Sequence, residues 1–497
     1  MLMLALVPAA LRAQAGATRS GAMPLSLNDA LRLATGTSEQ VALARAGEKR
    51  AQGQQLQARS ALLPQLSSTL NWQKQLQNQF AAISKRASGN GTGGDSSSSG
   101  GGGATSSITR IFASEYNFNL GLTASQQIYS GGRTGATIRA ARAGRESAEI
   151  GIATAQAQAQ LDVTQAYYDA LLADRLLTIS DSTLVQAERT LRQVQLTRSV
   201  GSASEFDLIR ARVTRDNQRP AWLQARTSRD LAYVRLRQLL NLDEDRSVTL
   251  TDSIAETAFA QTAVSNTPIT TVNVAAGDVL ALDPAVQARV ARTLAAIDTS
   301  ASTRAPVRQA SKGVEVAQQQ LRATRAQRLP SLSATTNYQR LAYPANVLPR
   351  SLADFFPNWT VGVGMSYPLF TGGRIRGDIL AAEASVAEAQ QRLRQAQEGA
   401  SFDARSSAAK LTEAEASWQA SVGTAEQAQR AFEIAEVRFR EGISTQLELS
   451  ETRVQLQQAL ANRARAARDL QVARKRLELL RDLPLSSGFT TPTSSNP

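Results

Sequence analysis

The chain has 497 residues and a formal net charge of +13, and it contains neither cysteine nor histidine. The missing residue types exclude disulfides, Cys/His zinc sites, cysteine nucleophiles and histidine-based catalytic triads. A basic total can indicate binding to nucleic acid or to an anionic membrane surface. Here the arginines are spread along helical segments among Glu, Gln and Ala, which favours solvated helix faces. The sequence contains no compact Lys/Arg block with interleaved aromatics, which is the pattern that would predict nucleic-acid binding.

The N-terminus has the pattern of a secretory signal. A short apolar run leads to the small-x-small site Ala13-Gln14-Ala15, so we expect residues 1–15 to form a signal peptide. A buried N-terminal helix is the alternative. No other stretch has the run of about 18 apolar residues that a membrane helix needs, so a membrane-spanning form of this chain must use β-strands.

Three landmarks occur twice in the same order, which indicates an internal duplication. The first copy also carries 25 extra residues, and they coincide with Ser88–Ser107, which is almost pure Gly, Ser, Thr and Asn. Such a composition predicts a flexible loop. The landmark pairs are Gly131 with Gly372 and Gly201 with Gly442, each 241 residues apart, and Pro64 with Pro330, 266 residues apart.

Each copy begins with a helix and continues with two short strands. In the first copy the helix runs from Leu25 to Leu62, with Ser26 or Asn28 as its cap and Pro64 ending it. The later strand of each copy alternates apolar with small or polar residues, and its length suits a tilted membrane strand of about 9–11 residues. A soluble sandwich hairpin is the alternative, because four strands alone cannot close a barrel.

Two very long helices follow the strands in each copy. Apolar residues recur at steps of three and four, as in a coiled-coil seam, and a glycine marks the hairpin tip between the helices. The expected organisation is a signal peptide 1–15, a first repeat 25–241, a connecting segment 242–281, a second repeat 282–482 and a tail 483–497. The first repeat has strands about 64–77 and 115–129 and helices 133–200 and 203–240; the second has strands about 330–340 and 358–370 and helices 374–440 and 445–481.

This repeat of helix, strands and long helices resembles the TolC family of outer-membrane efflux proteins. The strand-to-helix glycines Gly131, Gly132, Gly372 and Gly373, and the tip glycines, carry the resemblance. It implies a mainly α fold with a four-strand β section and internally duplicated long α-helical hairpins. The chain would be one protomer of a trimeric 12-stranded β-barrel, in outer-membrane lipid, with an α-helical tunnel in the periplasm.

The resemblance also assigns roles to residues at the tips. It implies that Asp207, Glu448 and Glu451 line the periplasmic aperture, where three protomers would form a ring of carboxylates that attracts cations. Solvated helix charges are the alternative for Glu448 and Glu451. Phe439 and Ser444 depart from the family pattern, because neither can supply the polar link that closes the aperture in some relatives. The resemblance further implies a periplasmic adaptor at the tip residues, which are Gly201, Ser202, Ala203, Ser204, Gly442, Ile443, Ser444 and Thr445.

The predicted function is a passive exit duct of a tripartite efflux or type I secretion system, coupled through the adaptor to an inner-membrane transporter. We expect no enzymatic activity, cofactor, metal or nucleic acid, since no phosphate-binding loop or convergent acid/base set is present. The alternative is a periplasmic coiled-coil scaffold without a pore. The alternating strands favour the duct, because a scaffold needs no lipid-facing residues such as Trp359 and Val361.

Overall fold

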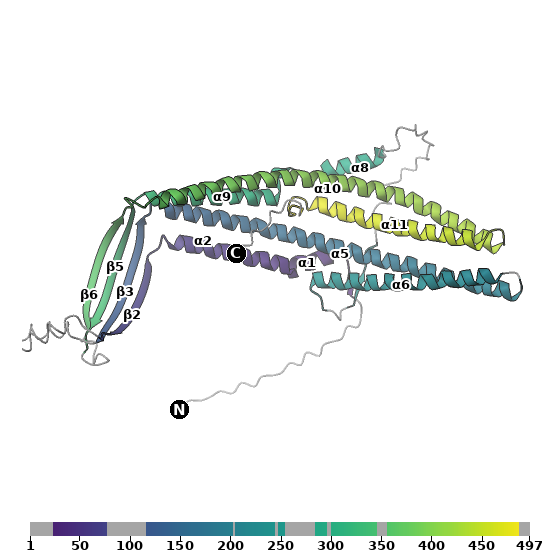
Figure 1. Ribbon diagram of the computed structural model, residues 1–497, viewed down its shortest axis with the longest axis horizontal. Coiled ribbons are helices and arrows are strands. Elements are labelled where there is room, and N and C mark those ends of the chain that lie inside the picture. Colours follow the sequence, from purple (N-terminus) through teal and green to yellow (C-terminus); the bar gives the residue numbers. More distant parts are fainter. Residues whose placement is uncertain are drawn as a thin grey trace, which may run out of the picture. The chain divides into compact units, whose positions relative to one another are not determined.

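The computed structural model describes residues 23–76, 116–201, 204–243, 247–253, 284–295, 300–344 and 355–486 (Figure 1). This part of the chain is mainly helical and carries a small antiparallel sheet, as the sequence predicted. The expected signal peptide 1–15, the Gly/Ser loop 88–107 and most of the connecting segment 242–281 lie outside the described residues, as does the tail beyond Ser486. The chain divides into two compact units, described separately below: residues 1–44, 152–306 and 398–497 form unit 1, and residues 45–151 and 307–397 form unit 2.

Unit 2 contains a four-stranded antiparallel sheet in the order β2-β3-β5-β6 (Figure 1). The strands are β2 (Gln65–Lys74), β3 (Tyr116–Tyr129), β5 (Ser331–Ala342) and β6 (Phe355–Ser366). Among the described residues, the first and last strands in this order, β2 and β6, each have a partner on one side only. The sheet is therefore open at two edges, and each edge presents unpaired backbone groups.

The register gives this sheet two different faces, because directly opposed residues on neighbouring antiparallel strands point to the same side. One face carries largely apolar rows, and the other carries rows of polar residues and glycine. The first face includes the rows Leu70, Leu120, Arg340, Pro357; Ser68, Leu122, Tyr338, Trp359; and Leu66, Ala124, Thr336, Val361. The second includes Thr69, Gly121, Gln339, Asn358; Ser67, Thr123, Asn337, Thr360; and Gln65, Ser125, Thr335, Gly362.

A pair of glycines joins a strand to a long helix in each copy. Gly131 and Gly132 have φ of 63° and 86°, and Gly372 and Gly373 have φ of 58° and 88°. This left-handed region favours glycine. At Gly131 the space is restricted as well, since an added Cβ would lie 2.7 Å from the Cβ of Leu329.

Four long helices continue from these turns (Figure 1). α5 (Arg133–Ser199) and α10 (Arg374–Arg440) each have 67 residues, and each is followed by a return helix, α6 (Glu205–Leu240) or α11 (Gln446–Glu478). Buried Ala, Leu and Val side chains form the contacts between helices in unit 1. None of the helices in the described ranges combines the length and the apolar character needed to cross a bilayer.

The first copy differs from the single helix expected over Leu25–Leu62. Leu25 lies in a short strand, β1 (Met23–Leu25), which pairs in parallel with β4 (Val248–Leu250), and the helical stretch is interrupted at Ser38. It consists of α1 (Leu27–Thr37) and α2 (Glu39–Ser60), and Ser26 caps α1 by accepting a hydrogen bond from the Asp29 N–H (3.2 Å).

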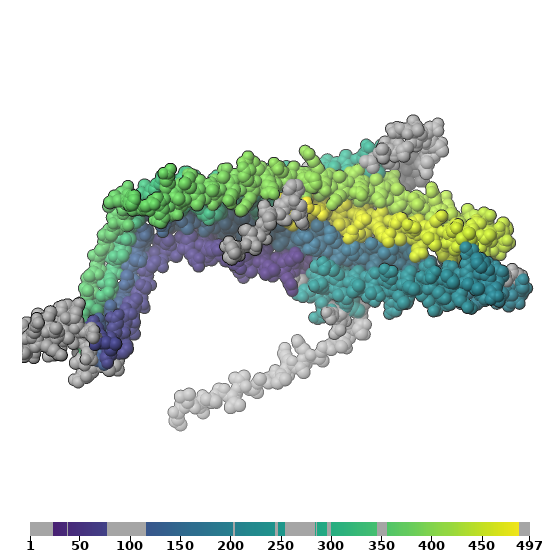
Figure 2. All heavy atoms as spheres, in the orientation of Figure 1, coloured from purple at the N-terminus to yellow at the C-terminus, as the bar shows by residue number. Residues whose placement is uncertain are grey.

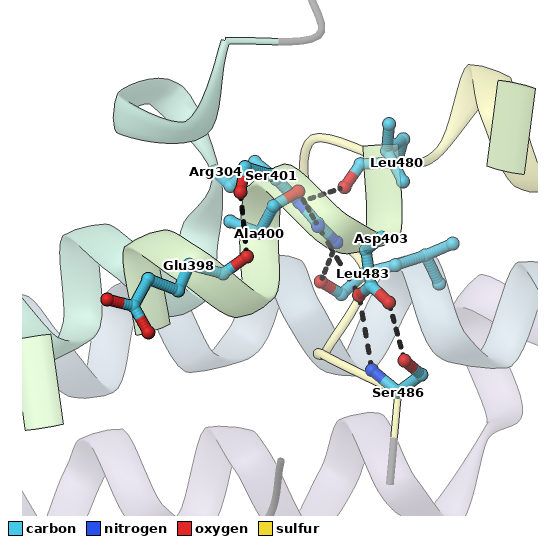
Figure 3. Close-up of polar contacts among 8 residues, drawn as sticks. All are labelled: Arg304, Glu398, Ala400, Ser401, Asp403, Leu480, Leu483 and Ser486. Carbon is cyan, nitrogen blue, oxygen red and sulfur yellow. Dashed lines mark hydrogen bonds and ion pairs between the residues drawn. The ribbon is translucent and has the colours of Figure 1, made fainter. Parts of the chain in front are cut away.

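The second copy starts with α8 (Pro284–Ala295), a 3-10 turn η1 (Ala301–Thr303), α9 (Ala305–Arg325) and a second 3-10 turn η2 (Ala326–Arg328). Between η1 and α9 lies Arg304, which is 1% exposed. Its guanidinium donates to the carbonyl oxygens of Leu480 (3.1 Å), Ala400 (3.1 Å) and Leu483 (3.5 Å) and to Asp403 Oδ2 (3.3 Å), as Figure 3 shows. One arginine thus connects the start of α9, the middle of α10 and the segment that follows α11, and we call this the arginine junction.

Candidate functional site

The two hairpin tips lie next to each other at one end of unit 1 (Figure 2). Phe439, at the end of α10, contacts the apolar clusters of both hairpins: it packs with Phe432 and Leu449 and also with Leu191 and Val194. The aromatic residue that departs from the family pattern is therefore part of the packing that holds the hairpins together.

A glycine with positive φ reverses the chain at each tip. Gly201 has φ of 78° and Gly442 has φ of 74°. At the second tip, the N–H groups of Ile443 and Ser444 donate to the Arg438 carbonyl oxygen at 2.9 and 3.3 Å. These bonds satisfy a carbonyl group at the helix end that has no partner within the helix. The tip backbone is therefore fixed by the helix ends on either side of it.

Asp207 is placed at the first tip, where it forms a capping box with Ser204. The Ser204 N–H and hydroxyl donate to Asp207 Oδ2 at 3.2 and 2.6 Å, and the Asp207 N–H donates to Ser204 Oγ at 3.1 Å. Such caps stabilise a helix start by about 1 kcal/mol. This capping role of Asp207 was not predicted from the sequence, although the Ser-x-x-Asp spacing is its usual signal.

The two glutamates of the second tip have different surroundings. Glu448 lies on the first turn of α11, its N–H donates to the Thr445 hydroxyl (3.3 Å), and its carboxylate pairs with Arg438 (3.2 Å). Glu451 is exposed, and within the described part of the chain no ion pair or hydrogen bond engages its carboxylate. The two residues are three positions apart, so they share one face of α11. Of the two, Glu451 therefore carries the unneutralised charge.

A buried arginine that the sequence analysis did not single out links the two hairpins. Arg453 on α11 is 7% exposed, and its Nη2 donates to the hydroxyl of Thr190 on α5 at 3.0 Å. Its guanidinium carbon lies 6.0 Å from the centre of the Phe432 ring. Burial lowers the pKa of Arg453, and the charge of Glu436 opposes that shift. In the sequence, Arg453 lies in the apolar stripe of α11 between the buried residues Leu449 and Leu456, and this position was the signal that could have predicted its burial.

The structure describes some of the remaining predicted tip residues. Ser444 donates from its backbone to Arg438, and Ile443 is exposed, while Ser202 and Ala203 lie outside the described residues. Across the described ranges, no group of three or more carboxylate side chains is placed to hold a metal ion. The tips therefore offer charge, exposed apolar side chains and fixed turns, which are means of contact and of ion attraction.

A sheet with one apolar and one polar face and duplicated long helical hairpins are the features expected of an outer-membrane channel protein. A family model described as outer membrane efflux protein matches residues 30–242 and 287–481, more than half of the chain. The chain belongs to the outer membrane efflux protein family, as the resemblance to the TolC family predicted.

Solved outer-membrane channels have the same fold. The outer membrane protein VceC of Vibrio cholerae matches with a TM-score of 0.66 and 18% identity over 91% of this chain and 95% of that chain. CmeC of Campylobacter jejuni matches with a TM-score of 0.67 and 16% identity over 93% of this chain and 86% of that chain. The open state of MtrE of Neisseria gonorrhoeae matches with a TM-score of 0.63 and 17% identity over 92% of this chain and 89% of that chain. A comparison with curated protein sequences gave no match.

Family membership places the protein in the bacterial outer membrane, with its helical part in the periplasm, as a channel for efflux. The family is one of outer membrane efflux proteins, and the matched CmeC and MtrE structures are outer-membrane channels.

Proposed function

We propose that three copies of this chain form a passive exit duct, with a 12-stranded β-barrel in the outer membrane and a helical tunnel below it. The observation that carries the proposal is the two-faced sheet with two open edges. On its apolar face, Trp359, Val361 and Met365 are 72–74% exposed. A contiguous apolar surface of this kind marks a membrane or protein contact.

The open edges support assembly from several copies. Backbone N–H and C=O groups without partners are costly inside a bilayer, so spanning strands occur in closed barrels. Four strands do not close a barrel, whereas three sheets joined β6 to β2 give twelve strands without a free edge. In this arrangement the polar rows, such as Ser67, Thr123, Asn337 and Thr360, face the water-filled interior, and the apolar rows face lipid.

The tips are the proposed site for a periplasmic adaptor that couples the duct to an inner-membrane transporter. Val200, Phe206 and Ile443 are exposed apolar side chains at or beside the two turns. Exposed apolar side chains next to fixed polar turns suit contact with the helical ends of a partner. Small molecules and secreted proteins both remain candidate cargo, in a tripartite efflux or a type I secretion system.

The same geometry supports a cation-attracting periplasmic aperture formed by Asp207, Glu448 and Glu451. Charged side-chain rings select ions of opposite sign in channels. Since Glu448 is paired with Arg438 and Asp207 caps α6, Glu451 makes the largest contribution in our proposal.

Single-channel recording tests the proposal directly. The purified protein, inserted into a planar lipid bilayer, is expected to give discrete conductance steps with cation preference. A Glu448→Ala plus Glu451→Ala variant keeps the pore and loses part of that preference. A protein that inserts as a stable oligomer without conductance would instead be a scaffold, and the duct proposal would be wrong.

A further inference from the structure

The arginine junction of the second copy has a counterpart in the first copy. Ser38 and Arg304 are 266 residues apart, the spacing of the Leu-Pro landmarks. Both are extended residues between two helical segments, with φ/ψ of −61°/126° and −67°/138°. Each is followed directly by a helix, α2 or α9. Ser38 therefore occupies in the first copy the place that Arg304 occupies in the second.

The acceptors around the two positions also correspond. Asp162 and Asp403 are 241 residues apart, the spacing of the glycine landmarks, as are Ala159 and Ala400. In the second copy, the Asp403 carboxylate and the Ala400 carbonyl oxygen both accept hydrogen bonds from Arg304. The first copy thus repeats the carboxylate and the helical carbonyl and lacks the guanidinium.

A cavity of about 720 Å³ lies where that guanidinium is missing. Its lining includes Ser38, Ala159, Asp162, Leu239 and Leu242, together with a second carboxylate, Glu39, and two arginines, Arg235 and Arg237. A serine hydroxymethyl group is too short to reach the carboxylate as an arginine does. The cavity therefore lies at the first-copy position that corresponds to the arginine junction.

At Asp162, two neutral side chains donate hydrogen bonds in place of the one that Arg304 donates to Asp403 in the second copy. The Gln158 amide donates to Asp162 Oδ1 at 2.7 Å, and the Gln40 side chain also donates a hydrogen bond. Arg235 lines the cavity and acts on Asp162 only through its charge, and no cation of the described chain forms an ion pair with this carboxylate. Burial is the largest effect and raises the pKa of Asp162, as expected for a carboxylate that lacks a close cation.

We propose that this cavity is a binding site for one guanidinium group carried on an alkyl stem, held by Asp162 and by backbone carbonyl oxygens of the lining residues. The second copy shows that the same arrangement accepts this group, because Arg304 is held there by one carboxylate and three carbonyl oxygens. A guanidinium is planar and presents five donors in fixed directions, which suits acceptors from two separate segments. An ammonium has three donors around one point and fits this arrangement less well.

Binding of ethylguanidinium to the purified, assembled protein tests the site. We expect a saturable rise of the unfolding temperature and one binding site per chain by titration calorimetry. Ethylammonium, which has the charge without the planar fork, is expected to bind at least ten-fold more weakly. The Asp162→Asn variant should lose at least ten-fold in affinity, and Asp230→Asn, an exposed carboxylate outside the cavity, should bind as the wild type does.

Two further variants use the duplication as an internal control. Ser38→Arg fills the cavity with its own guanidinium, so the response to ethylguanidinium should disappear. Arg304→Ser opens the matching position in the second copy, so the number of sites should rise from one to two per chain. If either variant fails to fold, the comparison of Asp162→Asn with the wild type still decides the outcome.

A guanidinium group for this cavity has two sources, a free ligand and an arginine side chain of a second copy of the chain. A response of the wild-type assembly to ethylguanidinium supports the free ligand. No response, together with loss of the assembled species in both Asp162→Asn and Ser38→Arg, supports an arginine from a neighbouring copy. The proposal is overturned if ethylguanidinium gives no saturable response and both variants assemble normally, or if Asp162→Asn binds as tightly as the wild type.

Discussion

Removal of Arg304 is expected to be among the most destabilising single changes in unit 1. Arg304 and Asp403 are 1% and 4% exposed, so neither group can regain water when its partner is lost. In the Arg304→Ala variant, Asp403 keeps only the Ser486 N–H (3.1 Å) and hydroxyl (2.5 Å) as donors, and three carbonyl oxygens lose theirs. Breaking a buried ion pair from one side costs about 3–5 kcal/mol, and we expect a loss in that range.

The measurement is denaturant unfolding of the purified protein, followed by helical circular dichroism. The matched control is Arg142→Ala, which removes an exposed i,i+4 pair with Glu146 and should cost about 0.3–0.5 kcal/mol. The double change Arg304→Met with Asp403→Leu should cost less than Arg304→Ala, because apolar residues replace both charges. If Arg304→Ala loses less than about 1 kcal/mol, or no more than the control, the arginine junction does not hold the three segments together.

Three further predictions concern the tips and the first-copy cavity. Gly442→Ala should destabilise the fold by roughly 1–2 kcal/mol through backbone strain alone, because φ is 74° and the new Cβ would meet nothing within 4 Å. Gly423→Ala, inside α10, should instead stabilise the fold by about 0.5–1 kcal/mol, and equal effects in unfolding experiments would contradict this. Glu451→Gln should lower the cation-to-anion permeability ratio more than Glu448→Gln, and bilayer reversal potentials that rank them the other way would refute the assignment. Because the pKa of Asp162 is raised in the folded state, ionisation of this carboxyl reduces the folding stability of the wild type as pH rises above about 3.9. The Asp162→Asn side chain does not titrate, so the stability of this variant relative to the wild type should increase over that range. A stability difference that stays constant with pH would contradict the prediction.

The strand and helix pattern could be predicted from the sequence because its signals are local. Alternation along β3 and β6, and the glycines that follow strands or end helices, each act within a few residues of the structure they produce. Gly201 and Gly442 stand at the predicted turns because glycine adopts their left-handed backbone conformation at the lowest cost.

Structure that depends on distant partners could not be predicted in the same way. β1 and β4 have three residues each and pair across more than 200 residues of sequence, so neither shows a recognisable period. Gly36 and Ser38 weaken the helix at the break, but glycines such as Gly144 and Gly423 lie inside unbroken helices, so these residue types alone did not predict it. Arg304 is one arginine among many until the fold brings Ala400 and Leu480 to it.

The tip residues show the same limit for the candidate site. The spacing of Glu448 and Glu451 correctly placed both on one face of α11, but their different electrostatic surroundings depend on Arg438, which belongs to another helix. Asp207 was assigned by resemblance, and its local capping geometry was overlooked. Arg453 was hidden because a charged residue in an apolar stripe is recognised as buried only once Thr190 and Phe432 are seen beside it.

The most direct test of the proposed duct asks whether the open edges of the sheet meet between copies. The chain contains no cysteine, so introduced pairs report without background. Thr69→Cys in β2 is combined in turn with Asn358→Cys, Thr360→Cys and Gly362→Cys in β6, all on the polar face. On oxidation in membranes, at least one pair is expected to give covalent dimers and trimers, while Asn337→Cys with Thr360→Cys links within one chain. If that internal pair forms and every β2–β6 pair stays monomeric, the sheet is not closed by neighbouring copies and the account is contradicted.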